Sequence, residues 1–231
     1  MCLRKPLKIM YKISMSPEEI EALPMGGFSG EIVVVDCQGF KFRKALDYLK
    51  SQDVIGFDTE TRPNFSHQPH HYGVALLQLS GPDKAFLFRI KTLKQYRRLF
   101  KVLADENIVK VGAAVNDDIR GLQRYHDFKP SGFVDLQKIV WEYGIKDKSV
   151  KKMGANILGI KISKAQQLSN WEADELSEAQ QKYAATDAWI CREMYLKLQK
   201  SQKNPLTPEQ MAPQQQPKPS TEENTDVQSH S

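Results

Sequence analysis

The chain has 231 residues, a length that suits one domain of ordinary size with tails. Its 40% of hydrophobic residues supplies a core, and its mean hydropathy of -0.52 indicates a soluble protein. No run approaches the roughly 18 apolar residues that a membrane-spanning helix needs. The basic start, MCLRKPLKIMYKI, lacks the apolar segment of a signal peptide. These features argue against a membrane protein.

The cysteines indicate the cellular compartment. Cys2, Cys37 and Cys191 are odd in number and widely spaced. They match neither a disulfide framework nor a zinc-binding pattern. We therefore expect a reducing, cytoplasmic location.

The net charge of +5 is unevenly distributed. Residues 201–231 carry a charge of -2, so the first 200 residues carry +7. A basic body suits a polyanionic partner such as nucleic acid. Basic clusters occur at 91–101 and 146–152, and each of them also fits a solvated helix face.

Local patterns predict an alternation of strands and helices. A short helix is expected at 16–24, with Ser16 as N-cap and Pro17 as its first residue. The remaining predicted elements are strands at 31–36, 54–60, 73–81, 84–90 and 108–115, and helices at 40–52, 92–104, 117–126 and 177–199. A Gly-Pro-Asp turn joins the third and fourth strands as a hairpin. This order implies an α/β fold with a mixed, antiparallel plus parallel, central sheet flanked by helices.

The chain divides into three parts. Residues 1–30 form an N-terminal extension with the short helix, residues 31–200 form the domain, and residues 201–231 form a tail rich in Pro and Gln. The tail has almost no large apolar residues. It cannot bury enough surface to offset its ordering entropy, so we expect it to be disordered.

Two carboxylates end the predicted buried strand at 54–60. Asp58 and Glu60 are two residues apart, so the alternation of a strand places both on one face. With no Lys or Arg between them, they repel each other by roughly 1 kcal/mol, which a divalent cation would remove. An Asp-x-Glu pair is common, and two ordinary surface acids remain the alternative.

A further acid lies on the predicted C-terminal helix. Tyr183 and Asp187 are four residues apart among strong helix formers, so they share one helix face. There the carboxylate can bind a metal while the phenol reaches the water on it, and the two alanines between them keep that face free of bulk. Taken alone, Tyr183 also fits an ordinary half-buried core aromatic. Tyr143 and Asp147 repeat the spacing, but Gly144 indicates a helix end there.

Asn116, Asp117 and Asp118 open the helix that follows the strand at 108–115. One of the two acids fits an N-cap or a first-turn residue that complements the helix dipole. The other fits a metal ligand. Spacing alone does not say which is which.

Three stretches, in this order, resemble the motifs of the DEDD exonuclease superfamily: FDTET at 57–61, VGAAVNDDIRGL at 111–122 and YAATDAW at 183–189. This superfamily has a ribonuclease H-like three-layer fold, which polymerase proofreading domains, ribonuclease D and the Werner syndrome helicase exonuclease share. The tyrosine four residues before the last aspartate resembles the DEDDy subgroup, which has Tyr in place of His.

Further stretches resemble the Werner-type branch: VALLQLSG at 74–81, FVDL at 133–136, LSNW at 168–171 and KYAATDA at 182–188. The resemblance covers about residues 31–200 and identifies them as a 3′→5′ exonuclease domain. One departure is visible. Ile119 and Arg120 follow the aspartates of the second motif, where the Werner enzyme has a bulky aromatic shortly after its aspartate, so the resemblance does not extend to a stacking contact there.

The resemblance implies which residues bind metal. Asp58 would bridge two ions, and Glu60 and Asp187 would complete the site of the ion that carries the nucleophilic water. Asp118 would serve the second ion, largely through water. Such oxygen ligands suit two ions of Mg²⁺ or Mn²⁺ rather than zinc.

Other roles follow from the same resemblance. Asp118 is preferred to Asp117 because the acid of the family lies six residues past the glycine of the motif. Tyr183 would orient or help deprotonate the attacking water. Thr59 and Thr61 would contact the terminal nucleotide.

The implied function is hydrolysis at the 3′ ends of nucleic acid, with release of nucleoside 5′-monophosphates. The Werner-like stretches slightly favour single-stranded or recessed DNA over RNA. The alternative is a catalytically silent nucleic-acid-binding or scaffold module with the same fold. A degenerate module would lack one of the catalytic acids or the tyrosine, and all five are present in this chain.

The polar loop at 61–72 contains His67, His70 and His71. Clustered loop histidines are usually solvated, and without nearby cysteines they do not favour a zinc site. Because the loop follows Glu60 in sequence, a contact with nucleic acid is a second interpretation.

Overall fold

The computed structural model describes residues 9–63 and 73–212. The strands are β1 (Glu31–Val35), β2 (Val54–Thr61), β3 (Val74–Ser80), β4 (Lys84–Arg89), β5 (Val109–Gly112) and β6 (Phe133–Asp135). They form one sheet in the order β1-β4-β3-β2-β5-β6. β3 runs antiparallel to β2 and β4, and the other neighbours are parallel, so the predicted mixed sheet is confirmed.

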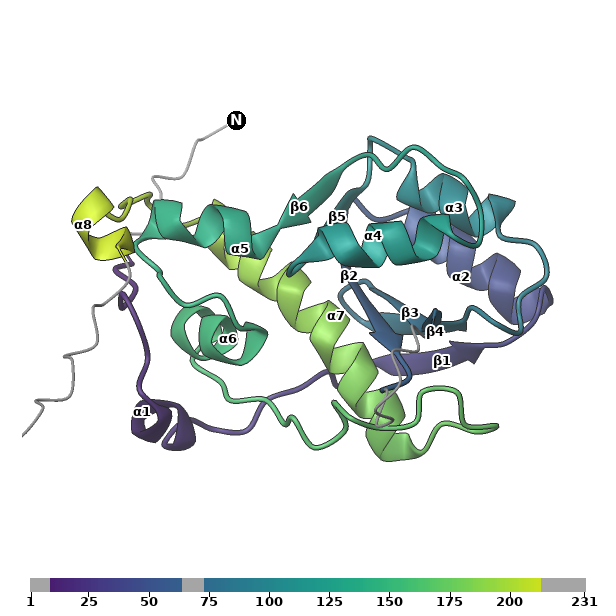
Figure 1. Cartoon of the computed structure of the whole chain (residues 1–231), viewed down its shortest axis with the longest axis horizontal. Helices are drawn as coiled ribbons and strands as arrows, with labels where there is room; N and C mark the ends of the chain where they lie inside the picture. Colours follow the sequence, from purple (N-terminus) through teal and green to yellow (C-terminus); the bar gives the residue numbers. More distant parts are fainter. Residues whose placement is uncertain (1–8, 64–72, 213–231) are drawn as a thin grey trace, which may run out of the picture.

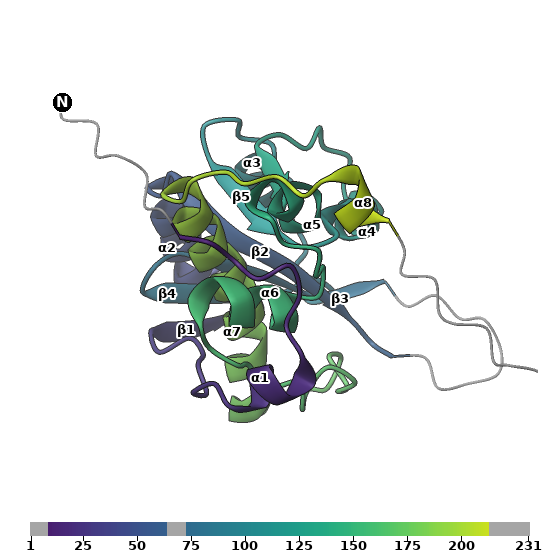
Figure 2. The same ribbon diagram turned by 90° about the vertical axis from the view of Figure 1, so that its left-hand side faces the viewer.

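Helices cover both faces of this sheet (Figure 1). They are α1 (Pro17–Glu21), α2 (Phe40–Lys50), α3 (Arg97–Leu103), α4 (Val115–Gln123), α5 (Leu136–Ile139), the 3-10 helix η1 (Val140–Tyr143), α6 (Val150–Leu158), α7 (Glu178–Gln199) and α8 (Pro208–Met211). One apolar cluster joins the sheet to α2, α3 and α4, and another joins it to α5, α6 and α7. The result is a three-layer α/β fold with α7 lying across the sheet (Figure 2). Within the described residues, no helix combines the length and the apolar character that a bilayer crossing requires.

The predicted starts of two helices are confirmed. The Ser16 hydroxyl accepts a hydrogen bond from the Glu19 N–H, and the Glu19 carboxylate accepts one from the Ser16 N–H. Ser177 and Gln180 make the same reciprocal pair at the start of α7. Each pair satisfies two backbone donors that the first turn leaves free.

The start of α4 differs from the prediction. Ala114 has a left-handed conformation with φ of 60° and serves as the N-cap, so the helix begins at Val115. No acid caps this helix. Of the two positions expected for one of these acids, the N-cap is wrong and the first turn is confirmed, since Asp117 and Asp118 both lie there. The short strand β6 was not predicted, because three residues cannot display an alternating pattern.

The N-terminal segment at 9–30 packs on the domain. The Asp147 carboxylate accepts a hydrogen bond of 2.8 Å from the Met15 N–H. The Phe28 N–H donates to the Thr186 hydroxyl of α7 at 3.1 Å. These contacts attach the segment to α6 and α7, and with them α1 lies next to α6 (Figure 2).

The segment at 201–212 is not disordered, which corrects the predicted boundary of the tail. Leu206 is buried, and its N–H donates to the Trp141 carbonyl at 2.9 Å. A single apolar side chain and main-chain pairing therefore hold this segment against η1. The rest of the predicted tail lies outside the described residues.

Candidate active site

Strand β2 points two acids toward α7. Ile55 and Phe57 belong to the apolar cluster on the other face of the sheet, so by alternation Asp58 and Glu60 point to the face that α7 covers. The ligand atoms of Asp58, Glu60 and Asp187 all lie within 4.8 Å of one another. The structure thus brings together three of the four acids that the sequence singled out.

Small residues allow α7 to lie close to β2. Ala184, Ala185 and Ala188 are fully buried, and Gly56 beneath them has no room for a side chain. The sequence pattern predicts that the two alanines between Tyr183 and Asp187 keep a catalytic helix face free of bulk. They belong instead to the helix–sheet interface, where their size brings Asp187 to the acids of β2.

Asp118 lies beside this group but outside the 4.8 Å cluster. It is half-buried on the first turn of α4, and its carboxylate accepts a hydrogen bond of 2.5 Å from the Thr59 hydroxyl. Asp117 points to solvent with 88% of its side chain exposed, and pairs with Arg120 at 2.7 Å. The structure therefore separates the two neighbouring aspartates that spacing left open: Asp118 faces the site and Asp117 does not.

Asp135 supports the turn that carries Asp118. One carboxylate oxygen of Asp135 accepts hydrogen bonds of 3.0 Å from the N–H groups of Ala114 and Gln137. These bonds hold the left-handed residue from which α4 starts, and so fix the first turn of the helix. The sequence analysis noted Asp135 only as part of a matching stretch, because its role depends on contacts across 21 residues.

Tyr183 lies beside Asp187 and packs as a half-buried aromatic. Its ring centroid is 5.9 Å from that of Trp171, and its hydroxyl interacts with the Asp187 carboxylate. Burial and then the charges of Asp187 and Glu60 raise the pKa of the Tyr183 phenol. The phenol therefore stays protonated near neutral pH.

The raised pKa values of the four acids indicate that a bound cation would stabilise their ionised forms. Burial, followed by neighbouring carboxylates, raises the pKa of Glu60 to about 8 and that of Asp58 well above its usual range. Burial raises the pKa of Asp187 to about 7, against a hydrogen bond from Tyr183 that lowers it. Burial also raises the pKa of Asp118 to about 6. Buried oxygen ligands without a compensating charge fit a hard divalent ion.

Two cavities share Thr59 in their linings. A cleft of about 310 Å³ holds Glu60, Tyr183 and Asp187. A cavity of about 650 Å³ lies on the side of Asp118, and its lining includes Thr59, Thr61, Arg120 and Arg124. The two threonines predicted to contact the nucleotide therefore lie next to the acids, and both face the larger cavity.

Sequence reasoning missed two lysines of the cleft. Lys151 and Lys164 line it together with Ser149. Lys151 belongs to the basic cluster at 146–152, where no pattern distinguished it from its neighbours. Lys164 gave no signal, although its positive charge lowers the raised pKa of Asp187.

The other candidates lie elsewhere. Gly144 has φ of 83° and ends η1, as expected, and Asp147 accepts hydrogen bonds from Ser14 and Met15 of the N-terminal segment. The repeated Tyr-x-x-x-Asp spacing at 143–147 is thus structural. His67, His70 and His71 lie outside the described residues.

Curated proteins similar to this chain are exonucleases. The mouse bifunctional 3'-5' exonuclease/ATP-dependent helicase WRN is 31% identical over 186 residues, which make up 76% of this chain and 13% of that protein. The mouse exonuclease 3'-5' domain-containing protein 2 is 33% identical over 212 residues, 79% of this chain and 32% of that protein. The chain thus spans less than a third of the length of either relative.

Solved structures share the fold. The EXO domain of Aedes aegypti Nibbler has a TM-score of 0.66 at 23% identity, over 76% of this chain and 91% of that chain. Trypanosoma brucei RNase D in complex with RNA U12 has a TM-score of 0.63 at 23% identity, over 74% and 63%. A family model described as 3'-5' exonuclease matches residues 33–203. The first and third motifs line one cleft, and Asp118 of the second motif lies beside it; with the matching family model, the chain belongs to the 3'-5' exonuclease family.

Proposed function

We propose that this chain is a metal-dependent 3′→5′ exonuclease that hydrolyses the last phosphodiester bond of a nucleic acid and releases a nucleoside 5′-monophosphate. The observation that carries the proposal is the cluster of Asp58, Glu60 and Asp187. Their ligand atoms lie within 4.8 Å of one another, and burial raises the pKa of all three. Such a cluster is stable in its ionised form only with bound cations.

The residues present fit two divalent ions of the Mg²⁺ or Mn²⁺ type. Asp58, Glu60 and Asp187 would hold one, and Asp58 together with Asp118 would hold the other. When bound, such ions lower the pKa of a water molecule and stabilise charge on a departing oxygen. The Thr59 hydroxyl orients the Asp118 carboxylate through its hydrogen bond, so it supports the second site from within β2.

Tyr183 positions the attacking water in this proposal. Its phenol interacts with Asp187, and its raised pKa keeps the proton on the oxygen near neutral pH. A protonated phenol orients a water molecule by hydrogen bonding but does not remove its proton. Of the two roles that the resemblance implies, orientation is therefore the one we propose.

DNA is the proposed substrate class, with a slight preference over RNA. The support is the likeness to WRN, an exonuclease and helicase, at 31% identity. RNase D, which matches in fold, was solved with RNA, so RNA must be tested beside DNA. A cytoplasmic location remains our proposal from the cysteine pattern.

The test is a degradation assay on 5′-labelled single-stranded DNA, recessed-duplex DNA and matched RNA. Each substrate is incubated with Mg²⁺, Mn²⁺ or EDTA, and with wild type or Asp58→Asn. We expect a ladder that shortens from the 3′ end, requires metal and is absent in the variant. Binding without cleavage under every metal condition would instead identify a silent nucleic-acid-binding module.

A further inference from the structure

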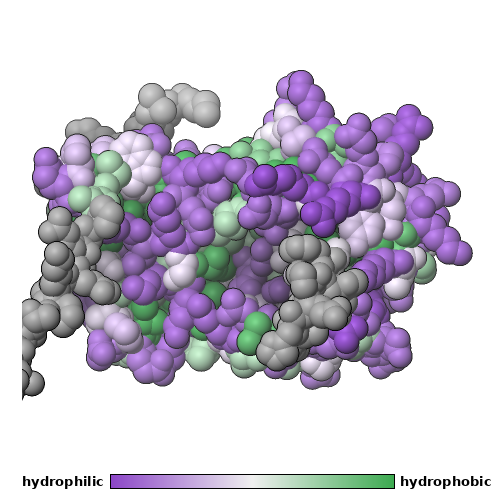
Figure 3. Space-filling view, in the orientation of Figure 1, coloured by the Kyte–Doolittle hydropathy of each residue, from purple (hydrophilic) through white to green (hydrophobic). Residues whose placement is uncertain are grey.

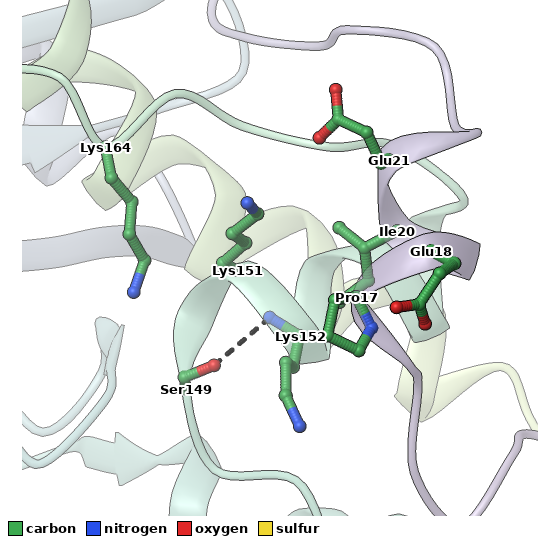
Figure 4. A pocket seen from close by; sticks show the side chains of 8 residues that line it. All are labelled: Pro17, Glu18, Ile20, Glu21, Ser149, Lys151, Lys152 and Lys164. Carbon is green, nitrogen blue, oxygen red and sulfur yellow. Dashed lines mark hydrogen bonds between the residues drawn. The ribbon is translucent and has the colours of Figure 1, made fainter.

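The catalytic cleft continues past its acids into a second cavity. Ser149, Lys151 and Lys164 line the cleft of about 310 Å³, and the same three residues line an adjoining cavity of about 450 Å³. The far wall of the second cavity is α1, through Pro17 and Ile20 (Figure 4). These shared residues therefore form the junction of the two cavities.

The two lysines at this junction are not held in salt bridges. Among the residues that the structure describes, Lys151 and Lys164 make no ion pair. Lys152, the next residue on α6, instead pairs with Asp147 at 3.2 Å. Figure 4 shows that Lys164 extends from its loop toward the start of α6, and that Lys151 and Lys152 leave the helix in different directions.

Acids lie only on the far side of the second cavity. Glu18 and Glu21 come from α1, and Glu21 is paired with Lys161 at 2.7 Å. The positive charge is thus concentrated at the junction, on the side of the catalytic cleft. Hydrophilic residues cover most of this face of the molecule, with apolar patches among them (Figure 3).

We propose that Lys151 and Lys164 bind a second phosphate group of the substrate, next to the phosphate that is cleaved. This inference rests on the proposed function, because it places the cleaved phosphate at Asp58, Glu60 and Asp187. Two ammonium groups that make no ion pair, beside the clustered carboxylates, can bind a phosphate in addition to the one that the metal ions would bind. The second phosphate comes either from the preceding nucleotide or from a phosphorylated 3′ end, and both present the same chemistry.

Three dinucleotides separate these two sources. In their formulas N is a nucleoside and p is a phosphate. NpN has only the phosphate to be cleaved. Compared with NpN, pNpN has an additional 5′ phosphate and NpNp has an additional 3′ phosphate. With the full chain and Mn²⁺, we expect kcat/KM for either pNpN or NpNp to be about tenfold higher than for NpN. One hydrogen bond to a charged group contributes about this much. The gain, measured in each variant relative to its own rate on NpN, should fall below about twofold in Lys151→Ala and in Lys164→Ala.

Matched variants control for the loss of positive charge. Lys152→Ala removes a charge from the same helix, and Lys101→Ala removes an exposed one from α3. Both should keep the gain. Equal rates for the three dinucleotides in the wild type, or a gain that survives Lys151→Ala combined with Lys164→Ala, would overturn the proposal.

A binding measurement separates this proposal from the proposed function. The three dinucleotides compete in EDTA against a labelled oligonucleotide for the full chain, so no cleavage is needed. If the wild type cleaves nothing, the proposed function fails, but a lysine-dependent preference for pNpN or NpNp still supports the phosphate site. If cleavage occurs and no such preference is found by either readout, only the phosphate site is wrong.

Discussion

Gly56 of β2 lies directly against the main chain of Ala188 of α7. A methyl group built on Gly56 would lie 1.8 Å from the Ala188 carbonyl oxygen, far inside van der Waals contact. Only a glycine allows this approach, and Asp187 is the residue before Ala188. The distance between the acids of β2 and of α7 is therefore set by the absence of a side chain at Gly56.

Gly56→Ala should separate the two halves of the site. The added methyl group would push α7 outward, and we expect a stability loss of about 1–3 kcal/mol, which is typical of overpacking. We also expect activity to fall about a hundredfold, because a displacement of catalytic groups by about 1 Å is enough for such a loss. Thermal unfolding and the degradation assay measure both. Gly39→Ala is the control, because a methyl there meets only the Cys37 sulfur at 3.7 Å. Full activity in Gly56→Ala would show that α7 does not need this contact.

Asp117 and Asp118 offer a matched pair of substitutions. Asp118→Asn removes a charge that faces the site, and we expect activity to fall about a hundredfold or more, as for other electrostatic catalytic groups. Asp117→Asn removes the same charge from a side chain that is 88% exposed, and should change activity less than twofold. Initial rates at saturating metal compare the two. If Asp117→Asn instead lowers activity more than Asp118→Asn, then Asp118 is not the acid that serves the second metal site.

Tyr183→Phe should affect catalysis far more than stability. The ring keeps its place beside Trp171, so the melting temperature should stay within a few degrees of the wild type. Loss of the hydroxyl removes the group that orients water, for which we expect kcat to fall about a hundredfold. Calorimetry and kcat on one single-stranded DNA measure both effects. A variant that unfolds early would instead show that the hydroxyl is chiefly structural.

Elements with local signals could be predicted from sequence, and those that depend on tertiary contacts could not. Capping residues gave the starts of α1 and α7, and alternation gave the face of Asp58 and Glu60. The start of α4 was missed, because an alanine rarely adopts the left-handed conformation of Ala114, which Asp135 holds from β6.

The same distinction applies to the site. The motifs named the acids and the tyrosine, since each motif is continuous in sequence. Lys151 and Lys164 come from α6 and from a separate loop, and only the fold brings them to one cleft. The packing of 201–212 could not be predicted for a similar reason. The segment has one buried apolar residue, Leu206, and a single such residue does not change the composition of the tail enough to indicate order.

The metal-free protein should lose stability as the pH rises. Burial raises the pKa of Glu60 to about 8 and that of Asp187 to about 7, from usual values of 4.5 and 3.8. The folded state then holds more protons than the unfolded state between about pH 4 and 8, so the free energy of unfolding falls through this range. We expect a loss of about 1 kcal/mol or more between pH 5.5 and 8 in EDTA, and a smaller loss with saturating Mg²⁺, which binds the ionised acids.

Glu60→Gln provides the decisive comparison for this pH dependence. The amide removes one buried charge without changing the shape of the side chain, so in EDTA the variant should be more stable than the wild type at pH 8 and should exceed it by less at pH 5.5. It should also gain less stability from Mg²⁺, because one ligand has lost its charge. Chemical denaturation at both pH values, with and without metal, measures these differences. A variant less stable than the wild type at pH 8 in EDTA would show that the Glu60 carboxylate is already compensated within the protein, and the argument for a cation at this cluster would fail.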